Sequence, residues 1–216
     1  MLEQKDEQLL IDLTSARGVP GNEEEVREVF KTYAKDYADE IIFDGLGSVI
    51  AKHGQDENSP RIFISGHMDE VGLRGARTST YLANPEIAFA LDTGTAGDTP
   101  GMTPKEADSV LGKGPQILIF DASMVPHKKL LNFVTDVAEE LEIPFQYTVI
   151  AGGGTDAGQM HLTRQGIPSL AITVPVRYLH SHTSVIHEDD YLNTVKLVTE
   201  VVRRLDRTTV DQILSY

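Results

Sequence analysis

Short apolar runs recur along the chain with enough sequence between them for a helix, and this alternation limits the fold more than any other feature. Most of the runs lack interrupting polar residues, a pattern typical of strands buried on both faces of a sheet. The runs are residues 61–65, 87–91, 116–120, 146–150 and 169–174. Strands that alternate with helices favour an α/β fold with a parallel or mixed sheet.

Helical patterns lie between and around these runs. Apolar residues recur at helical spacing in residues 5–17, and a second helix should follow with Asn22 as its N-cap. The clearest later helices are 128–141, 156–164 and 188–205, and 72–82 is a weaker one. Residues 40–44 and 48–52 flank Gly45-Leu46-Gly47 and indicate a hairpin. We therefore predict a single domain over residues 1–216, with a mixed, mostly parallel sheet flanked by helices.

The charge of the chain excludes several classes of function. There are 33 acidic residues and 19 basic ones, a net charge of −14, which opposes binding to nucleic acid or to an anionic membrane. The acidic, amphipathic start does not resemble a secretory signal, so we expect a cytoplasmic protein. The chain has no cysteine, so any metal ion must be held by His, Asp and Glu.

Several potential metal ligands follow the predicted strands. In open α/β sheets, function collects beyond the carboxyl ends of the strands. Residues 61–65 run into His67, 87–91 into Asp92, 116–120 into Asp121, and 169–174 into a segment that reaches His180. Nitrogen and oxygen ligands without sulfur suit Zn²⁺, Co²⁺ or Mn²⁺. Taken singly, a His or Asp at a strand end is more often a hydrogen-bonded loop residue than a ligand, so the hypothesis rests on the set. Asp121 is the weakest candidate because Asp121-Ala122-Ser123 has the composition of a turn.

Two other active-site motifs are incomplete. The glycine-rich segment 152–158 lacks the Gly-Lys-Ser/Thr ending of a phosphate-binding loop, so Thr155 or Asp156 is better interpreted as a helix N-cap. Ser65-Gly66-His67 lacks the Gly-x-Ser-x-Gly elbow of the α/β-hydrolases. A metal-dependent site therefore remains the stronger hypothesis.

Taken together, these segments resemble the dinuclear metallo-aminopeptidases of the M42 type, which include glutamyl and deblocking aminopeptidases. The resemblance spans nearly the whole chain and implies a zinc-peptidase-like catalytic domain. The blocks that carry it, in family order, are Gly66-His67-Met68-Asp69, Glu70-Val71-Gly72-Leu73-Arg74-Gly75-Ala76, Asp92 with Gly97-Asp98-Thr99-Pro100-Gly101, Gly154-Thr155-Asp156-Ala157 and Arg177-Tyr178-Leu179-His180.

The resemblance implies roles for five residues. His67 and Asp92 correspond to ligands of one metal ion, and Glu70 and His180 to ligands of a second. Asp69 resembles the carboxylate that orients His67. The implied reaction removes the N-terminal residue of a peptide: two divalent ions, Zn²⁺ or Co²⁺, lower the pKa of a bound water, a carboxylate takes its proton, and the carbonyl is attacked. On this reading Asp69 and Glu70 are the catalytic carboxylates.

The chain departs from the family at residues 68–73. In the family, the His-Met-Asp-Glu-Val-Gly and Glu-Glu-Val-Gly-Leu-Arg-Gly-Ala blocks lie far apart, and between them come a β-rich oligomerisation domain, one strand and a metal-bridging Asp. Here the two blocks are fused, so only residues 61–65 precede both His67 and Glu70. Asp69 aligns either with the carboxylate that orients His67 or with the general base, and it cannot serve as both. We therefore expect weakened metal binding, with one ion or none, and impaired turnover.

Two alternatives to an aminopeptidase stay open at this point. One is a catalytically inactive, shortened form of the fold that acts as a structural or binding module. The other is a different co-catalytic zinc hydrolase, of the carboxypeptidase or deacylase kind. Because the oligomerisation domain is missing, we expect a monomer or small homo-oligomer that acts on peptides, and an unpaired strand edge beside residues 61–65.

Overall fold

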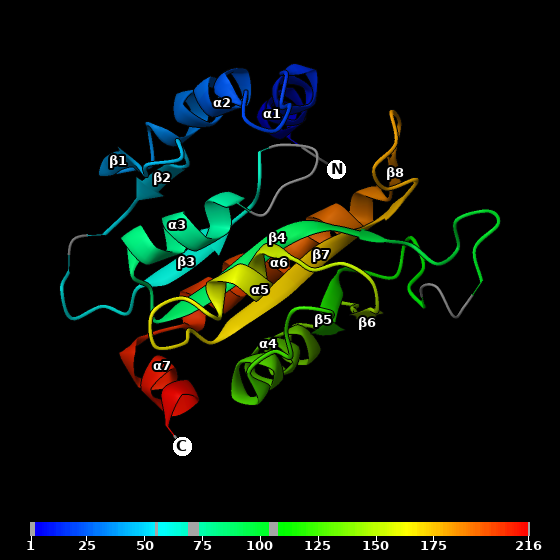
Figure 1. The fold of residues 1–216 in the computed structure, drawn as a ribbon. Helices are drawn as coiled ribbons and strands as arrows, with labels where there is room; N and C mark the ends of the chain where they lie inside the picture. The colour runs from blue at the N-terminus through cyan, green and yellow to red at the C-terminus, as the bar shows by residue number, and fades with distance from the viewer. Residues whose placement is uncertain (1–2, 55, 69–73, 104–107, 216) are drawn as a thin grey trace.

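A computed structural model describes residues 3–54, 56–68, 74–103 and 108–215. Its centre is a six-stranded sheet in the order β3-β4-β7-β5-β6, with β8 paired to β7 (Figure 1). The pairs β3–β4, β4–β7 and β5–β6 are parallel, whereas β5–β7 and β7–β8 are antiparallel. The prediction of a mixed, mostly parallel sheet is therefore confirmed. The strands are β3 (Ile62–Ser65), β4 (Ile87–Thr95), β5 (Gln116–Asp121), β6 (Gln146–Ile150), β7 (Ser169–Arg177) and β8 (Val185–Ile186).

Helices cover both faces of this sheet because alternate side chains of its central strands are apolar on both sides. On one face, Ile87, Phe89 and Ile172 belong to a core that includes residues of α4 (Lys128–Glu140), α6 (Glu188–Arg204) and α7 (Arg207–Leu214). On the other face, Ala88 and Ala171 contact a core that includes residues of α3 (Arg74–Ala83) and α5 (Asp156–Met160). The small alanine side chains let α5 approach the sheet closely.

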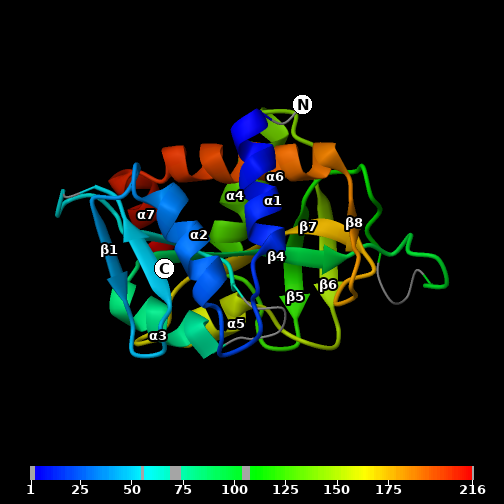
Figure 2. The same cartoon turned by 90° about the horizontal axis from the view of Figure 1, so that it is seen from above.

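The N-terminal part forms a separate unit beside the main sheet (Figure 2). It consists of α1 (Gln4–Ser15), α2 (Glu24–Ala34) and an antiparallel hairpin of β1 (Glu40–Phe43) and β2 (Val49–Lys52). The Tyr33 hydroxyl donates to Asp12 Oδ2 at 2.7 Å and joins α2 to α1. Asp44 accepts from the Ser48 amide at 2.8 Å and from Thr78 Oγ1 at 2.6 Å, so one carboxylate closes the hairpin turn and ties it to α3.

Strand β3 lies at the end of the main sheet. It pairs with β4, and no strand pairs with its other edge among the residues that the structure describes. This is the unpaired edge expected beside residues 61–65. The opposite end of the sheet is β6, where Tyr147 and Val149 are 48% and 42% exposed, so the prediction that this run is buried on both faces is wrong. The same prediction is wrong for 61–65, where Ile64 is exposed, and for the end of 116–120, where Ile119 and Phe120 are exposed. These side chains lie where no helix of the described residues packs fully over the face of the sheet, whereas the central strands β4 and β7 are covered on both faces.

Several predicted boundaries are wrong. Strand β4 continues past Leu91 to Thr95 because it stays paired with β7 as far as Val176, so Asp92 lies within the strand. Strand β7 runs to Arg177, and α5 ends at Met160. Glu23, not Asn22, is the N-cap of α2. The final helix α7 was not predicted, although Asp206 caps it by accepting from the Thr209 amide at 2.8 Å. Among the described helices, none is both long and apolar enough to cross a bilayer.

Candidate metal centre

His67 and Asp92 come from neighbouring parallel strands that end in the same direction. Ser65 of β3 is in register with Ala90 of β4, and each predicted ligand lies two residues further along its chain. His67 Nε2 is 3.5 Å from Asp92 Oδ1, and the two side chains are 25% and 21% exposed. The register of the two strands therefore brings this pair together at the accessible end of the sheet.

This separation suits two ligands of one metal ion. With bonds of about 2.1 Å and tetrahedral angles, two ligand atoms on zinc lie about 3.4 Å apart. The Thr93 amide donates to Asp92 Oδ1 at 2.7 Å, which fixes the orientation of the carboxylate. An imidazole nitrogen and an oriented carboxylate oxygen form a donor pair that Zn²⁺ or Co²⁺ accepts.

The structure does not bring His180 to this pair. His180 is exposed and lies in the turn that connects β7 to β8. Tyr178 and His180 have φ values of 63° and 60°, a region that residues with side chains seldom adopt and that often marks functional turns. Within the described residues, no group of three His, Asp or Glu side chains has the geometry of a metal site. The other two predicted residues, Asp69 and Glu70, lie outside the described residues.

Asp121 has a structural role. Its side chain is buried, and it accepts from the Ser123 amide and hydroxyl at 2.7 and 2.6 Å and from the Thr155 amide and hydroxyl at 3.2 and 2.8 Å. The turn predicted at Asp121-Ala122-Ser123 is present. Thr155 is the N-cap residue of α5, but its hydroxyl bonds to Asp121 and makes no capping bond. With its oxygens engaged by these donors, Asp121 is unsuited to bind a metal.

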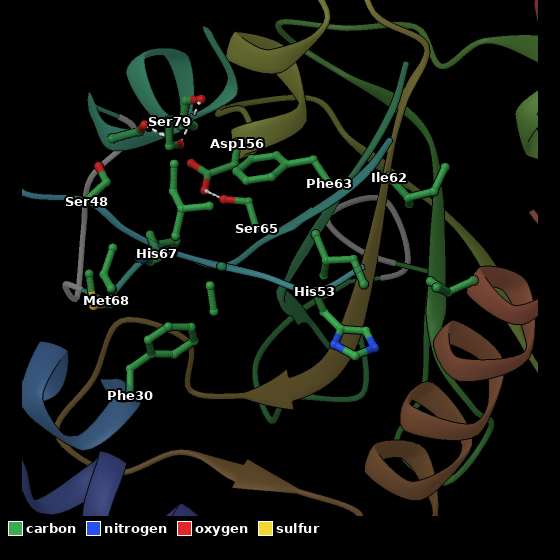
Figure 3. Close-up of a pocket in the computed structure, with 18 of the residues that line it drawn as sticks. Phe30, Ser48, His53, Ile62, Phe63, Ser65, His67, Met68, Ser79 and Asp156 are labelled. Atoms are coloured by element: carbon green, nitrogen blue, oxygen red, sulfur yellow. Dashed lines mark hydrogen bonds between the residues drawn. The ribbon is translucent and has the colours of Figure 1, made fainter. Parts of the chain in front are cut away.

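Asp156 is the residue whose position the sequence did not reveal. It begins α5, is 4% exposed, and accepts from Ser65 Oγ at 3.3 Å. Both residues line a cavity of about 930 Å³ that also includes His67 and Met68 (Figure 3). The sequence suggested Asp156 as a helix cap and as part of a family block, whereas the structure places its carboxylate beside the strand that leads to His67.

An ion pair holds the segment that follows β4 against the end of β7. Arg177 pairs with Asp98, which belongs to the 97–101 block. The Arg177 guanidinium lowers the pKa of the Asp98 carboxyl, and Asp98 in turn raises the pKa of Arg177. This contact fixes the base of the turn that carries His180.

Comparison with known proteins identifies the family. The model of the M42 glutamyl aminopeptidases matches residues 70–197. The chain belongs to this family. A second family model, AMPT, matches residues 4–30. The M42 match begins at Glu70, within residues 68–73, where we expect from the sequence that two family blocks are fused.

The curated relatives of this M42 chain are longer than the chain itself. A putative aminopeptidase of Acetivibrio thermocellus is 40% identical over 140 residues, which are 65% of this chain and 42% of the relative. The glutamyl aminopeptidase of Lactococcus lactis is 36% identical over 163 residues, 74% of this chain and 44% of the relative. The chain therefore spans less than half the length of these relatives.

Solved structures share the fold of this M42 chain. A TET aminopeptidase from a marine sediment Thaumarchaeota archaeon superposes with a TM-score of 0.92 at 25% identity, and the match covers 97% of this chain and 99% of that one. The Pyrococcus horikoshii TET1 peptidase, described as assembling into a tetrahedron or a large octahedral shell, superposes with a TM-score of 0.76 at 21% identity, covering 90% of this chain and 98% of that one. The second likeness concerns the fold alone.

Proposed function

We propose that this chain is a metal-dependent aminopeptidase that releases N-terminal residues from peptides, and that the fusion at residues 68–73 impairs it. Membership of the M42 family supports the reaction class. One observation carries the metal dependence: His67 Nε2 and Asp92 Oδ1 lie 3.5 Å apart, the separation of two ligands on one ion. Family membership also favours an aminopeptidase over a carboxypeptidase or deacylase.

The proposed roles follow the family blocks. His67 and Asp92 would hold one divalent ion, Zn²⁺ or Co²⁺, and Glu70 and His180 would hold a second. When bound, such ions lower the pKa of a water molecule and polarise the scissile carbonyl. Asp69 either orients His67 or accepts a proton as general base. Asp69 and Glu70 lie outside the described residues, so their roles rest on the sequence.

The impairment has a physical cause. The chain lacks the bridging carboxylate that compensates the repulsion between two close cations. His180 is exposed and belongs to no three-ligand group within the described part of the chain. We therefore propose that His67 and Asp92 retain at most one ion, and that the second position, at Glu70 and His180, binds a metal ion only weakly. This arrangement also supports the alternative of an inactive binding form, which retains no ion.

Metal content per chain tests the proposal. The protein is dialysed against trace Zn²⁺ or Co²⁺ and its metal content is measured by elemental analysis, alongside His67→Ala, Asp92→Ala and His180→Ala. His53→Ala is the matched control, because His53 lines the same cavity and its side chain is 83% exposed. We expect one ion, lost in His67→Ala and Asp92→Ala and kept in His53→Ala. A metal-free parent chain that releases no amino acid from peptides or aminoacyl nitroanilides would establish the inactive form instead.

We also propose that residues 1–216 form a single catalytic-type domain that acts on peptides as a monomer or small homo-oligomer. The internal fusion removes the segment that carries the family's oligomerisation domain. The large assemblies described for the TET1 peptidase therefore do not extend to this chain.

A further inference from the structure

The large cavity separates two sheets. It is lined by Val49, Ile50 and Ala51 of β2 and by all four residues of β3, Ile62–Ser65 (Figure 3). Each of these strands pairs with one neighbour, β2 with β1 and β3 with β4, and neither has a second strand partner in the described part of the chain. At about 930 Å³ the cavity falls within the range of ligand-binding pockets, and His67 lies at one end of it.

The unpaired edge of β3 presents backbone hydrogen-bonding groups to the cavity. The Arg61 carbonyl accepts from the Glu86 amide at 2.9 Å, so the backbone of Arg61 faces the β4 side. Backbone groups alternate between the two edges of a strand, so those of Ile62 and Ile64 point away from β4. Ile64 is also 43% exposed. An apolar strand with an open edge is a template for another strand.

The edge of β2 is open in the same way. The Lys52 carbonyl accepts from the Asp39 amide at 2.8 Å and the Ser48 carbonyl from the Asp44 amide at 3.2 Å, so both face the β1 side. By alternation, the backbone groups of Val49 and Ala51 point away from β1. An extended segment in the cavity could therefore pair with a strand on each side.

We call the space between the open edges of β2 and β3 the slot. Because the hairpin bounds one side of it, the slot favours a single extended peptide over a second copy of the chain. A second copy of the chain would have to present its own β3, whose open edge is flanked by its own β1–β2 hairpin, and two such edges cannot meet without displacing the hairpins. A single extended peptide needs only the width of one strand. We propose that this slot binds the N-terminal segment of the peptide substrate as an added strand, antiparallel to β3, with the N-terminal residue at His67. This inference rests on the proposed aminopeptidase function.

The position of the candidate metal centre sets the direction in which the peptide lies along β3. Strand β3 runs toward His67, so a peptide with its N-terminus there must run back along β3, antiparallel to it. The four residues of β3 span about 13 Å, enough for about four peptide residues.

Charges at the two ends agree with this direction. Asp156 lines the cavity near His67, where the peptide's ammonium group would lie, and Arg203 and Arg207 line its other end. Arg207 pairs at 2.9 Å with Glu86, which in turn accepts from the Arg61 amide just before β3. A carboxylate near the peptide's N-terminus and arginines toward its C-terminus complement the polarity of a short peptide.

A pair of substitutions at one position tests the backbone pairing. Ile64→Pro removes an N–H that points to the slot and leaves the bonds to β4, and proline is tolerated at such an edge position. Ile64→Ala removes the side chain and keeps the N–H. The probe is Ala-Val-Thr-Val-Thr-Lys, with fluorescein on the Lys side chain and its first peptide bond reduced so that it cannot be hydrolysed. By fluorescence anisotropy we expect at least about tenfold weaker binding in Ile64→Pro and less than about threefold in Ile64→Ala.

Hydrogen exchange of the parent chain gives a second measurement that depends on no variant. Binding of the probe should slow exchange of the Ile62 and Ile64 amides, which face the slot. Equal binding by parent and Ile64→Pro, or unchanged exchange at both amides in the saturated parent, would overturn the proposal. So would no binding of the probe at all.

The direction of the bound peptide is tested by disulfide cross-linking. The chain has no native cysteine, so an introduced cysteine is the only protein thiol that can react. A form of the probe with a C-terminal cysteine should cross-link to Asn58→Cys, before β3, and not to Met68→Cys, after it. The reverse pattern would overturn the antiparallel arrangement. Failure of this inference is distinguishable from failure of the proposed function. Peptide hydrolysis that is unchanged in Ile64→Pro would refute only the slot, whereas probe bound along β3 without any hydrolysis of ordinary peptides would refute only the reaction.

Discussion

His67 Nε2 lies 3.5 Å from Asp92 Oδ1 because two parallel strands in register carry the two residues to the same level of the sheet. Neither side chain depends on a long loop for its placement. The distance exceeds that of a good hydrogen bond and matches the spacing of two ligands on one ion. Strand register thus places the two proposed ligands of one ion side by side without help from the segment that follows His67.

Double substitution should reveal that His67 and Asp92 serve the same ion. Each single alanine variant should lower Zn²⁺ affinity at least about 100-fold, since loss of a mere supporting partner already costs about 10- to 100-fold. His67→Ala combined with Asp92→Ala should cost less than the sum of the two single effects, because the first substitution already destroys the position. Titration with a chromophoric chelator measures these affinities. Strict additivity of the two effects would place the residues on different ions.

Substitution of Asp121 should lower the stability of the fold without affecting metal binding, whereas substitution of Asp92 should lower metal affinity. Asp121→Ala leaves the buried donors of Ser123 and Thr155 without their acceptor, so we expect a loss of roughly 3 kcal/mol in the free energy of unfolding. Metal content of the folded protein should stay at the parent value. Urea unfolding and elemental analysis on the same preparation check both statements. Loss of metal from a variant that remains folded would assign Asp121 to the metal centre.

The sequence predicted the parts of this fold that depend on local pattern. Uninterrupted apolar runs located the strands, and the rule that function gathers at the carboxyl ends of strands pointed to His67 and Asp92. The same rule pointed to Asp121 and His180, which the structure does not bring to that pair. The strand limits were less predictable. Asp92 resembled the end of a strand because it is charged, but pairing of β4 with β7 carries the strand on to Thr95.

Long-range relationships escaped prediction for a different reason. Ser65 and Asp156 are 91 positions apart in the chain, and no local sequence pattern predicts the hydrogen bond between them. The cavity beside them exists because two separate sheets end with open edges facing it, which depends on the placement of the β1–β2 hairpin. Only a three-dimensional structure defines such a space.

Asp44 should make stability depend on pH. Partial burial raises the pKa of its carboxyl, but hydrogen bonds from Thr78, Ser48 and Leu46 outweigh that effect and hold the pKa below its usual value. A carboxylate with a lowered folded-state pKa stabilises above the unfolded pKa of about 3.9, and this contribution is lost as pH falls through the folded pKa. We expect Asp44→Asn to lose roughly 1–2 kcal/mol at pH 7.

Chemical unfolding of the parent and of Asp44→Asn from pH 7 to pH 3 provides the check. The difference between the two proteins should be nearly constant above about pH 5 and should shrink below about pH 4. Because Asp44 closes the hairpin that lines the slot, Asp44→Asn should also weaken binding of the peptide probe. A stability difference that does not change with pH would mean that the charge of Asp44 contributes nothing.

The mass in solution should be small. The chain has a mass of 23.7 kDa, and we expect light scattering to give one or two times this value. The β1–β2 hairpin lies across the cavity from the open edge of β3, which leaves room for one added strand but limits pairing with the sheet of another copy. A particle of twelve copies, as in the dodecamer described for a structural neighbour, would contradict the proposed small assembly.

Gly94 should tolerate no side chain, because β4 passes a buried polar cluster at this position. A Cβ added to Gly94 would meet Gln116 Oε1 at 1.9 Å and Thr173 Oγ1 at 2.6 Å, and those two atoms are themselves hydrogen-bonded at 2.6 Å. Gln116 also donates to the Thr95 carbonyl at 3.0 Å, so moving it away breaks bonds that no water replaces in a buried site.

We expect Gly94→Ala to lower the free energy of unfolding by roughly 2–3 kcal/mol, as overpacking in a close-packed interior does. Gly45→Ala is the matched control, because nothing lies within 4 Å of a Cβ at Gly45 and the effect there should stay within about 0.5 kcal/mol. Urea unfolding of the three proteins measures both changes. Since Gly94 lies two residues after Asp92 on the same strand, Gly94→Ala should also lower metal retention by shifting that carboxylate, whereas Gly45→Ala should not. Equal stability of the two variants would contradict this prediction. It would mean that Gln116 and Thr173 can move away from the added methyl group without a loss of stability.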